Sequence, residues 1–248
     1  MTQIALVTGG SRGIGAAVAR QLGRTGWAVA VNFNRSPDRA DGVVADITKA
    51  GGRAIAVQAD VSDRDAVARM FAQIDQKLGR IDALVNNAGT NGKVMPFADL
   101  DVASLMEVYA TNVFGSFYCA QEAARRMSTL SGGVGGAIVN VSSISARTGG
   151  MPGHVHYASS KGAVDVFNYA LAKELGPQKI RVVAIRPGVT NTEIQQVFGG
   201  AEMFKRVLPT IPIGRIGEPE DIAAVVAWAL SPAASYVTGT TIDVSGGR

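Results

Sequence analysis

The chain has 248 residues, 47% hydrophobic and 18% charged, a balance typical of a globular protein and not of a disordered one. Its formal charge of +4 favours anionic ligands, but Lys and Arg are scattered and form no cluster of the kind that binds nucleic acid. No apolar stretch reaches the ~20 residues of a membrane span, and the sequence begins without the features of a signal peptide. We therefore expect a mature cytoplasmic protein without membrane or nucleic-acid partners.

Short apolar runs alternate with longer amphipathic runs along the whole chain. Strands are expected at residues 4–7, 28–32, 54–58, 83–85, 137–141, 181–185 and 241–244, and their Val, Ile and Ala content suits parallel strands buried on both faces. Helices are expected at residues 14–24, 37–50, 63–78, 102–127, 157–175 and 219–230. This alternation predicts one α/β domain over residues 1–248: a doubly wound Rossmann fold with a seven-stranded, mostly parallel sheet and helices on both faces.

The first strand is followed at once by a glycine-rich loop that reads T-G-G-S-R-G-I-G over residues 8–15. Glycines allow a tight turn and a close approach of the backbone to a pyrophosphate, and the following helix offers free N–H groups to the anion. The spacing is wider than in the common G-x-G-x-x-G motif. A strand–helix turn without a ligand is the alternative, but the position in the first βαβ unit favours a dinucleotide site.

The loop resembles the T-G-x-x-x-G-x-G motif of the short-chain dehydrogenase/reductase family, and the resemblance covers essentially the whole chain. Further matches follow in chain order at Asp60-Val61, Asn86-Asn87-Ala88-Gly89, Asn112, Ser143, Tyr157 with Lys161, and Pro187-Gly188 with Thr192. Ser143 and Tyr157 stand one residue further apart than in many members. Ser142 and Ser145 therefore stay as alternatives to Ser143.

The residue types at these positions suit hydride transfer to a carbonyl group. Carbonyl reduction leaves negative charge on oxygen, so a proton must be delivered there, and a tyrosine whose pKa is lowered by a nearby ammonium can give or take it. Tyr157 and Lys161 stand four residues apart on one expected helix and share a face. Ser143 would hold the substrate oxygen. The resemblance implies that Lys161 also binds the nicotinamide ribose and that Asn112 holds a water in a proton relay.

The resemblance also implies an NADP or NAD site with no metal. The expected contacts are Gly9, Ser11, Arg12, Gly13, Ile14, Gly15, Asn34, Arg35, Ser36, Asp60, Val61, Asn87, Ala88, Gly89, Tyr157, Lys161, Pro187, Gly188, Val189 and Thr192.

The end of the second expected strand favours NADP. NAD enzymes usually carry an acidic side chain there to grip the ribose hydroxyls, but this chain has Phe33 followed by Asn34 and Arg35. An arginine can hold a 2′-phosphate through paired, charge-assisted hydrogen bonds. The alternative is that Asp38 reaches back to the ribose and that NAD is used.

The substrate is expected to be a small carbonyl or alcohol compound. The sequence is similar both to 3-oxoacyl-carrier-protein reductases and to sugar or polyol dehydrogenases, and residues 189–217, which break the strand–helix rhythm, are expected to form a substrate lid. A cofactor-binding regulator without catalysis is the alternative from another class. Because the expected helices at 102–127 and 157–175 carry more apolar surface than one sheet face can cover, we expect a homotetramer, as in family members.

Overall fold

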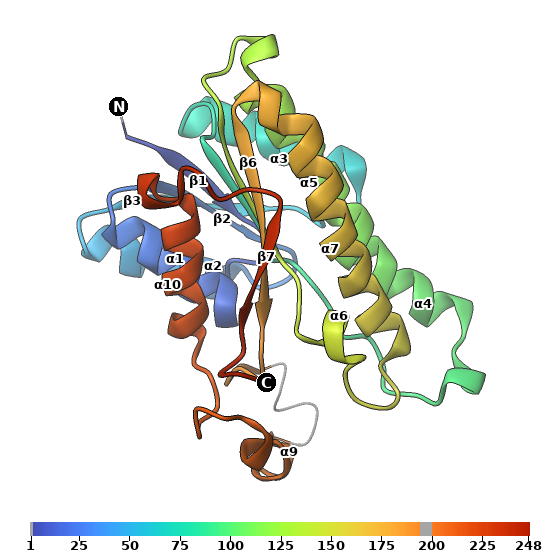
Figure 1. The fold of residues 1–248 in the computed structure, drawn as a ribbon. Helices are drawn as coiled ribbons and strands as arrows, with labels where there is room; N and C mark the ends of the chain where they lie inside the picture. Colours follow the sequence, from blue (N-terminus) through green and yellow to red (C-terminus); the bar gives the residue numbers. More distant parts are fainter. Residues whose placement is uncertain (1, 194–199) are drawn as a thin grey trace.

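A computed structural model describes residues 2–193 and 200–248. Its centre is a parallel sheet in the order β3-β2-β1-β4-β5-β6-β7 (Figure 1), so the expected sheet is confirmed and is parallel throughout the described residues. The chain crosses between the two halves of the sheet after β3, which makes the β1–β4 boundary a topological switch point. The strands are β1 Ile4–Val7, β2 Ala28–Phe33, β3 Arg53–Gln58, β4 Ala83–Asn86, β5 Gly136–Val141, β6 Ile180–Pro187 and β7 Thr240–Val244.

Helices cover both faces of the sheet (Figure 1): α1, α2 and α10 lie on one face, and α3, α5 and α7 lie on the other. The α-helices are α1 Gly13–Arg24, α2 Pro37–Lys49, α3 Arg64–Lys77, α4 Val102–Tyr109, α5 Gly115–Met127, α6 Ser145–Thr148, α7 Val155–Leu175, α9 Gly200–Val207 and α10 Pro219–Leu230. Short 3₁₀ turns occur at Phe97–Asp99, Thr129–Ser131, Gly176–Gln178, Leu208–Thr210 and Pro232–Ala234.

Each face of the sheet has its own apolar core, as expected for strands buried on both sides. Residues of β1 alternate between the two cores: Ala5 and Val7 pack with α1 and α10, whereas Leu6 packs with α3 and α5. Cys119 lies in the second core, where burial raises the pKa of its thiol to about 12. The described residues include no helix long and apolar enough to cross a membrane.

The expected single helix at residues 102–127 is wrong in one respect, because a π-helical turn, η2 (Ala110–Phe114), separates α4 from α5. Asn112 lies in this turn, and its side chain exchanges two hydrogen bonds with the backbone of Thr90, at 2.8 and 2.9 Å. These bonds fix the extra residue of the turn. π-turns inside helices are frequent at functional sites, because they re-aim one side chain.

The segment expected to form a lid lies beside the carboxyl edge of the sheet, and Figure 1 shows α9 beyond the ends of β6 and β7. Its two ends are joined at a bridge between Thr190 and Gly217, supported by a 2.7 Å hydrogen bond from Asn191 N to Gly217 O. A small apolar cluster around Met203 and Val207 packs α9 against Met151. The part of this expectation that covers residues 194–199 lies outside the described residues.

Candidate active site

A cleft of about 680 Å³ opens at the switch point, where the carboxyl ends of β1 and β4 meet. Its volume falls in the range of 300–1,000 Å³ that is usual for ligand and cofactor sites. The glycine loop and the end of β2 line one part of the cleft, and α7 lines another. Ligands bind at this position in open α/β sheets, so the fold itself places a site here.

The glycine loop is shaped for close contact with an anion. Gly9 has a φ of +61°, which favours glycine, and its N–H donates to Asn32 Oδ1 at 3.1 Å. The first turn of α1 carries no acidic residue, and Arg12, which precedes the helix, makes no capping hydrogen bond with its side chain. The free N–H groups and the positive end of the helix dipole therefore face the cleft.

The loop after β4 is tied to the glycine loop by polar contacts. The hydroxyl of Thr8 accepts hydrogen bonds from Asn87 N at 2.9 Å and from Ala88 N at 3.0 Å. The Asn87 side chain donates back to Thr8 O at 2.9 Å and to Gly9 O at 3.2 Å. These reciprocal bonds explain why threonine and asparagine occur in the two motifs, and they hold both walls of the cleft in register.

Tyr157 and Lys161 both line the cleft from α7. The Lys161 side chain is buried, its Nζ donates to Val141 O at 2.8 Å, and it lies 5.9 Å from the centroid of the Tyr157 ring. The hydroxyl of Ser142 donates to the backbone oxygen of Lys161 at 3.1 Å, which fixes this part of α7 against the end of β5. Tyr157 and Lys161 therefore face the interior of the cleft and do not form an exposed pair on the helix surface.

Burial shifts the pKa of both Lys161 and Tyr157. It lowers the pKa of Lys161 to about 8, although the charge of Asp165 acts in the opposite direction. Burial raises the pKa of Tyr157, and a hydrogen bond with Ser143 opposes that rise. Lys161 is thus a buried amine that titrates near neutral pH, next to a phenol that burial holds protonated.

Asn112 approaches the same place from the π-turn. A Cβ added to Gly89 would lie 3.2 Å from Asn112 Oδ1 and 3.5 Å from Lys161 Nζ, so these two polar atoms converge on the Gly89 backbone. Asn112 Nδ2 also donates to Ser160 Oγ at 3.0 Å. The buried Asn112 side chain thus joins the loop after β4 to α7, and it does not itself line the cleft.

Ser143 and Tyr157 line two adjoining cavities, the cleft and a smaller one of about 80 Å³. The Ser142 hydroxyl, by contrast, donates its hydrogen bond to the backbone oxygen of Lys161, and Ser145 lines only the smaller cavity. This placement favours Ser143 over both alternatives as the hydroxyl next to Tyr157. The smaller cavity is the natural position for substrate, and its remaining walls come from Asn91, Ile144, Thr148, Gly150, Met151, His154, Gly188, Val189, Met203 and Arg248.

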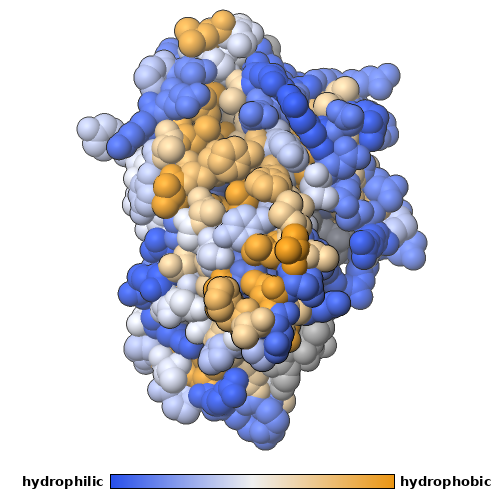
Figure 2. Space-filling model, turned by 90° about the vertical axis from the view of Figure 1, so that its right-hand side faces the viewer, coloured by the Kyte–Doolittle hydropathy of each residue, from blue (hydrophilic) through white to orange (hydrophobic). Residues whose placement is uncertain are grey.

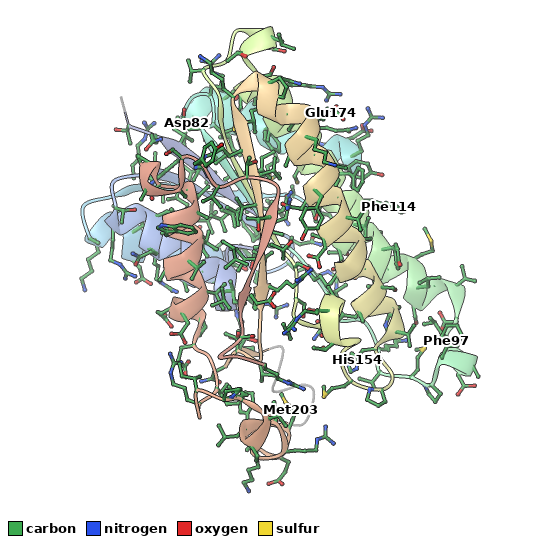
Figure 3. All side chains as sticks on the ribbon, in the orientation of Figure 1. Asp82, Phe97, Phe114, His154, Glu174 and Met203 are labelled. Atoms are coloured by element: carbon green, nitrogen blue, oxygen red, sulfur yellow. The ribbon has the colours of Figure 1, made fainter. Side chains whose placement is uncertain are left out.

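Figure 3 labels two of these wall residues, His154 just before α7 and Met203 in α9. Both lie toward the carboxyl ends of the strands.

The end of β2 forms the part of the cleft expected to hold the adenosine ribose. Phe33, Asn34 and Arg35 line it, as do Arg12 and Asp60. Arg35 acts electrostatically on Asp60, and both residues line this part of the cleft. Burial raises the pKa of Asp60, but hydrogen bonds from Ser62 and Asn34 outweigh this and lower it. Asp38 is exposed on the first turn of α2 and does not line the cleft.

The cleft brings together nearly all of the expected cofactor contacts. Val189 is the exception, because it lies in the smaller cavity and not in the cleft. The sequence interpretation did not include several cleft residues that belong to no glycine or catalytic motif, because only the folded loops bring them in: Asn32, Ala59, Ser62, Thr90, Asn91, Glu107, Ala110, Thr111, Val141, Thr190 and Glu193. Over the described ranges, no group of three or more His, Cys, Asp or Glu side chains could hold a metal ion.

Comparisons with known proteins agree with this geometry. The family described as enoyl-(acyl carrier protein) reductase matches residues 9–248. The uncharacterized oxidoreductase YgfF of Escherichia coli (strain K12) is 46% identical, and the match covers 99% of both chains. The 3-oxoacyl-[acyl-carrier-protein] reductase of Synechocystis sp. is 37% identical over 99% of this chain and 96% of its own.

Solved structures show the same fold. A short-chain type dehydrogenase/reductase from Mycobacterium marinum has a TM-score of 0.93 and 37% identity, over 99% of this chain and 94% of its own. A 7α-hydroxysteroid dehydrogenase, solved with NADH and 7-oxo glycochenodeoxycholic acid, has a TM-score of 0.93 and 35% identity, over 99% of this chain and 93% of its own. With relatives of this similarity along its whole length, the chain belongs to the short-chain dehydrogenase/reductase family and is an NAD(P)-dependent oxidoreductase.

Proposed function

We propose that the protein is an NADP(H)-dependent oxidoreductase that transfers a hydride between nicotinamide and a small carbonyl or alcohol substrate. The observation that carries the proposal is the shared cleft, in which Ser143, Tyr157 and Lys161 face the same space as the glycine loop. The catalytic residues are Asn112, Ser143, Tyr157 and Lys161. The cofactor contacts are the expected set without Val189, which lines the smaller cavity and not the cleft.

The residues present fit a dinucleotide. The glycine loop offers a close backbone approach and free N–H groups for the pyrophosphate, and the guanidinium groups of Arg12 and Arg35 line the same cleft. Bound nicotinamide supplies or accepts the hydride.

The chain's own residues supply the proton and hold the substrate. Ser143 donates a hydrogen bond to the substrate oxygen and orients it. The Tyr157 hydroxyl gives its proton to that oxygen in reduction, or its phenolate removes the proton in oxidation. The Lys161 ammonium stabilises the phenolate. Asn112 fixes the backbone of Thr90, which follows Gly89 in the loop next to Lys161.

Cofactor choice gives a direct test. We expect NADPH to bind more tightly than NADH, because Arg12 and Arg35 line the cleft and β2 ends without an acidic side chain. Replacing Arg35 with Ala should narrow the difference by about 1–3 kcal/mol, the range for a lost hydrogen bond to a charged group. Titration calorimetry with both cofactors measures it.

Arg24→Ala is the matched control, because Arg24 ends α1 at the opposite pole from the cleft. Equal affinities of the unmodified protein for NADPH and NADH would rule out the NADP assignment. NAD with a sugar or polyol substrate would then be the better interpretation, and the hydroxysteroid dehydrogenase solved with NADH is a precedent for that cofactor.

The substrate side of the proposal depends on the smaller cavity and on the segment 189–217, which we propose acts as the substrate lid. The apolar walls of the smaller cavity, Ile144, Met151 and Met203, suit the carbon skeleton of a substrate. A panel of carbonyl compounds, with NADPH oxidation as the readout, should include 3-oxoacyl thioesters and keto sugars. Turnover of none of them, with cofactor still bound, would favour the regulator without catalysis.

We also propose that the protein is a homotetramer. Two apolar residues of α7 lie outside its core-facing side: Val166 is 69% exposed and Tyr169 is 39% exposed. Phe114 and Phe117 of the η2–α5 region are also partly exposed, and Phe117 stacks on Phe167 of α7 at 4.0 Å between ring centroids. Figure 2 shows apolar side chains gathered on this side of the molecule, and the Phe114 label in Figure 3 marks its outer edge.

Light scattering at micromolar concentration tests the assembly. We expect a mass near four times the 25.7 kDa of one chain, because two separate apolar faces give two twofold interfaces. The second face would include Tyr236, which is fully exposed, and Trp228. Val166→Lys should reduce the tetramer to dimers, whereas Lys173→Ala on the same helix should leave it intact. A monomer mass for the unmodified protein would contradict the proposal.

A further inference from the structure

A buried carboxylate lies one helical turn beyond the active-site lysine. Asp165 follows Lys161 by four residues on α7, so the two side chains share a face of the helix. Each is only 5% exposed. A charged pair this deeply buried is costly unless each member is compensated by a partner.

The partner of Asp165 comes from the neighbouring strand. Arg186 of β6 donates from Nε to Asp165 Oδ2 at 2.8 Å, and its other arm reaches Asp243 Oδ1 of β7 at 3.3 Å. Asp243 in turn pairs with the half-exposed Arg147 of α6 at 3.1 Å. The second oxygen of Asp165, Oδ1, is buried and finds no hydrogen-bond partner among residues 2–193 and 200–248.

An unpaired buried carboxylate oxygen is unfavourable for folding, so its presence calls for a compensating role. A group that gains from the negative charge is the Lys161 ammonium, one helical turn away, which burial drives toward the neutral form. Among the described residues Lys161 Nζ donates a hydrogen bond to Val141 O alone. The charged groups that face Asp165 are Lys161 from its own helix and Arg186 from β6. Behind Arg186 stand Asp243 and Arg147, and no other charged group of the described residues acts on Lys161.

We propose that Asp165 is a positioning residue whose negative charge holds Lys161 in its ammonium form, and that Arg186 sets the strength of this effect. The inference rests on the proposed function, because it assigns Lys161 to the reaction. Asp165 touches neither cleft nor smaller cavity and acts only through Lys161. Arg186 fixes the carboxylate in place and also screens part of its charge.

The test is the pH dependence of two quantities, NADPH affinity and kcat/KM for carbonyl reduction, from about pH 6 to about pH 10, a range that spans ordinary His and Lys titration. In the unmodified protein both should fall as Lys161 loses its proton, near the pKa of about 8. Asp165→Asn keeps the shape but removes the charge. The basic limb of each pH profile is the pH range over which the measured quantity falls. In Asp165→Asn this limb should lie about one pH unit lower, as expected for the loss of a unit charge in a partly polar interior.

Two further variants separate charge from architecture. Asp165→Glu retains the charge and should restore the position of the basic limb. Arg186→Gln removes the screening cation, so its limb should move the opposite way, to higher pH. Asp46→Asn, which breaks the surface pair with Arg20, is the matched control and should shift nothing.

The outcomes are distinct. A merely structural Asp165 would lower affinity and rate evenly across pH, and unmoved limbs in Asp165→Asn or in Arg186→Gln would overturn the proposal. If Asp165→Asn does not fold, the upward shift in Arg186→Gln decides alone. In Lys161→Met the NADPH affinity should no longer fall at basic pH, which would identify Lys161 as the group that causes the basic limb of the affinity profile. Loss of Tyr157-dependent turnover in the unmodified protein would sink the proposed function, yet the affinity profile would still report on Asp165.

Discussion

Replacing Tyr157 with Phe is expected to lower kcat by about 10²–10⁴-fold, the usual contribution of general acid–base catalysis. The change removes the proton that the substrate oxygen must receive and leaves the ring volume unchanged. Because the ring still fills its place beside Ser143 and Lys161, NADPH affinity should stay within about threefold of the unmodified protein, or roughly 0.7 kcal/mol. Stopped-flow NADPH oxidation and titration calorimetry measure the two quantities.

Two variants on the same helix serve as controls for Tyr157→Phe. Tyr169→Phe removes a phenol hydroxyl from the outer, exposed face of α7 and should leave kcat unchanged. Lys161→Ala should reduce both turnover and cofactor affinity, because the ammonium acts on the phenol and on the ribose. A Tyr157→Phe protein that kept more than about a tenth of normal kcat would contradict the assigned role of the phenol.

Local sequence patterns predict most of this fold because its strands are short, apolar and buried on both faces. Each expected strand is present, with ends that differ by at most two residues, and the glycine loop lies at the switch point where the motif places it. The site motifs were also readable, since each stands at the end of a strand or on one helix. Strand ends at the same sheet edge meet whatever lies between them in the chain.

Features that depend on contacts between distant segments were not predictable. The π-turn at Asn112 arises because the Asn112 side chain bonds to Thr90, 22 residues earlier, and helical periodicity cannot reveal such a partner. The Asp165–Arg186 pair joins α7 to β6 across 21 residues. In the sequence Asp165 is one polar residue of an amphipathic helix, and only burial of both partners reveals a role.

A second large effect is expected from adding a side chain to Gly15 in the glycine loop. A Cβ there would lie 2.3 Å from Gly9 O and 2.5 Å from Asn87 Nδ2, closer than real Cβ contacts. Both contacted atoms belong to the network that joins the two walls of the cleft, because Asn87 Nδ2 donates to Gly9 O at 3.2 Å. A methyl group must therefore push the two loops apart.

We expect Gly15→Ala to lose about 1–3 kcal/mol of unfolding free energy through overpacking. NADPH affinity should fall by about tenfold or more, equivalent to about 1.4 kcal/mol, because the loop N–H groups leave their positions around the pyrophosphate. Urea unfolding and calorimetry measure both. Gly42→Ala on the exposed face of α2 is the matched control: its Cβ meets nothing within 4 Å, and the helix should gain about 0.5–1 kcal/mol. Unchanged affinity in Gly15→Ala would show that the loop tolerates displacement and that the phosphates are held elsewhere.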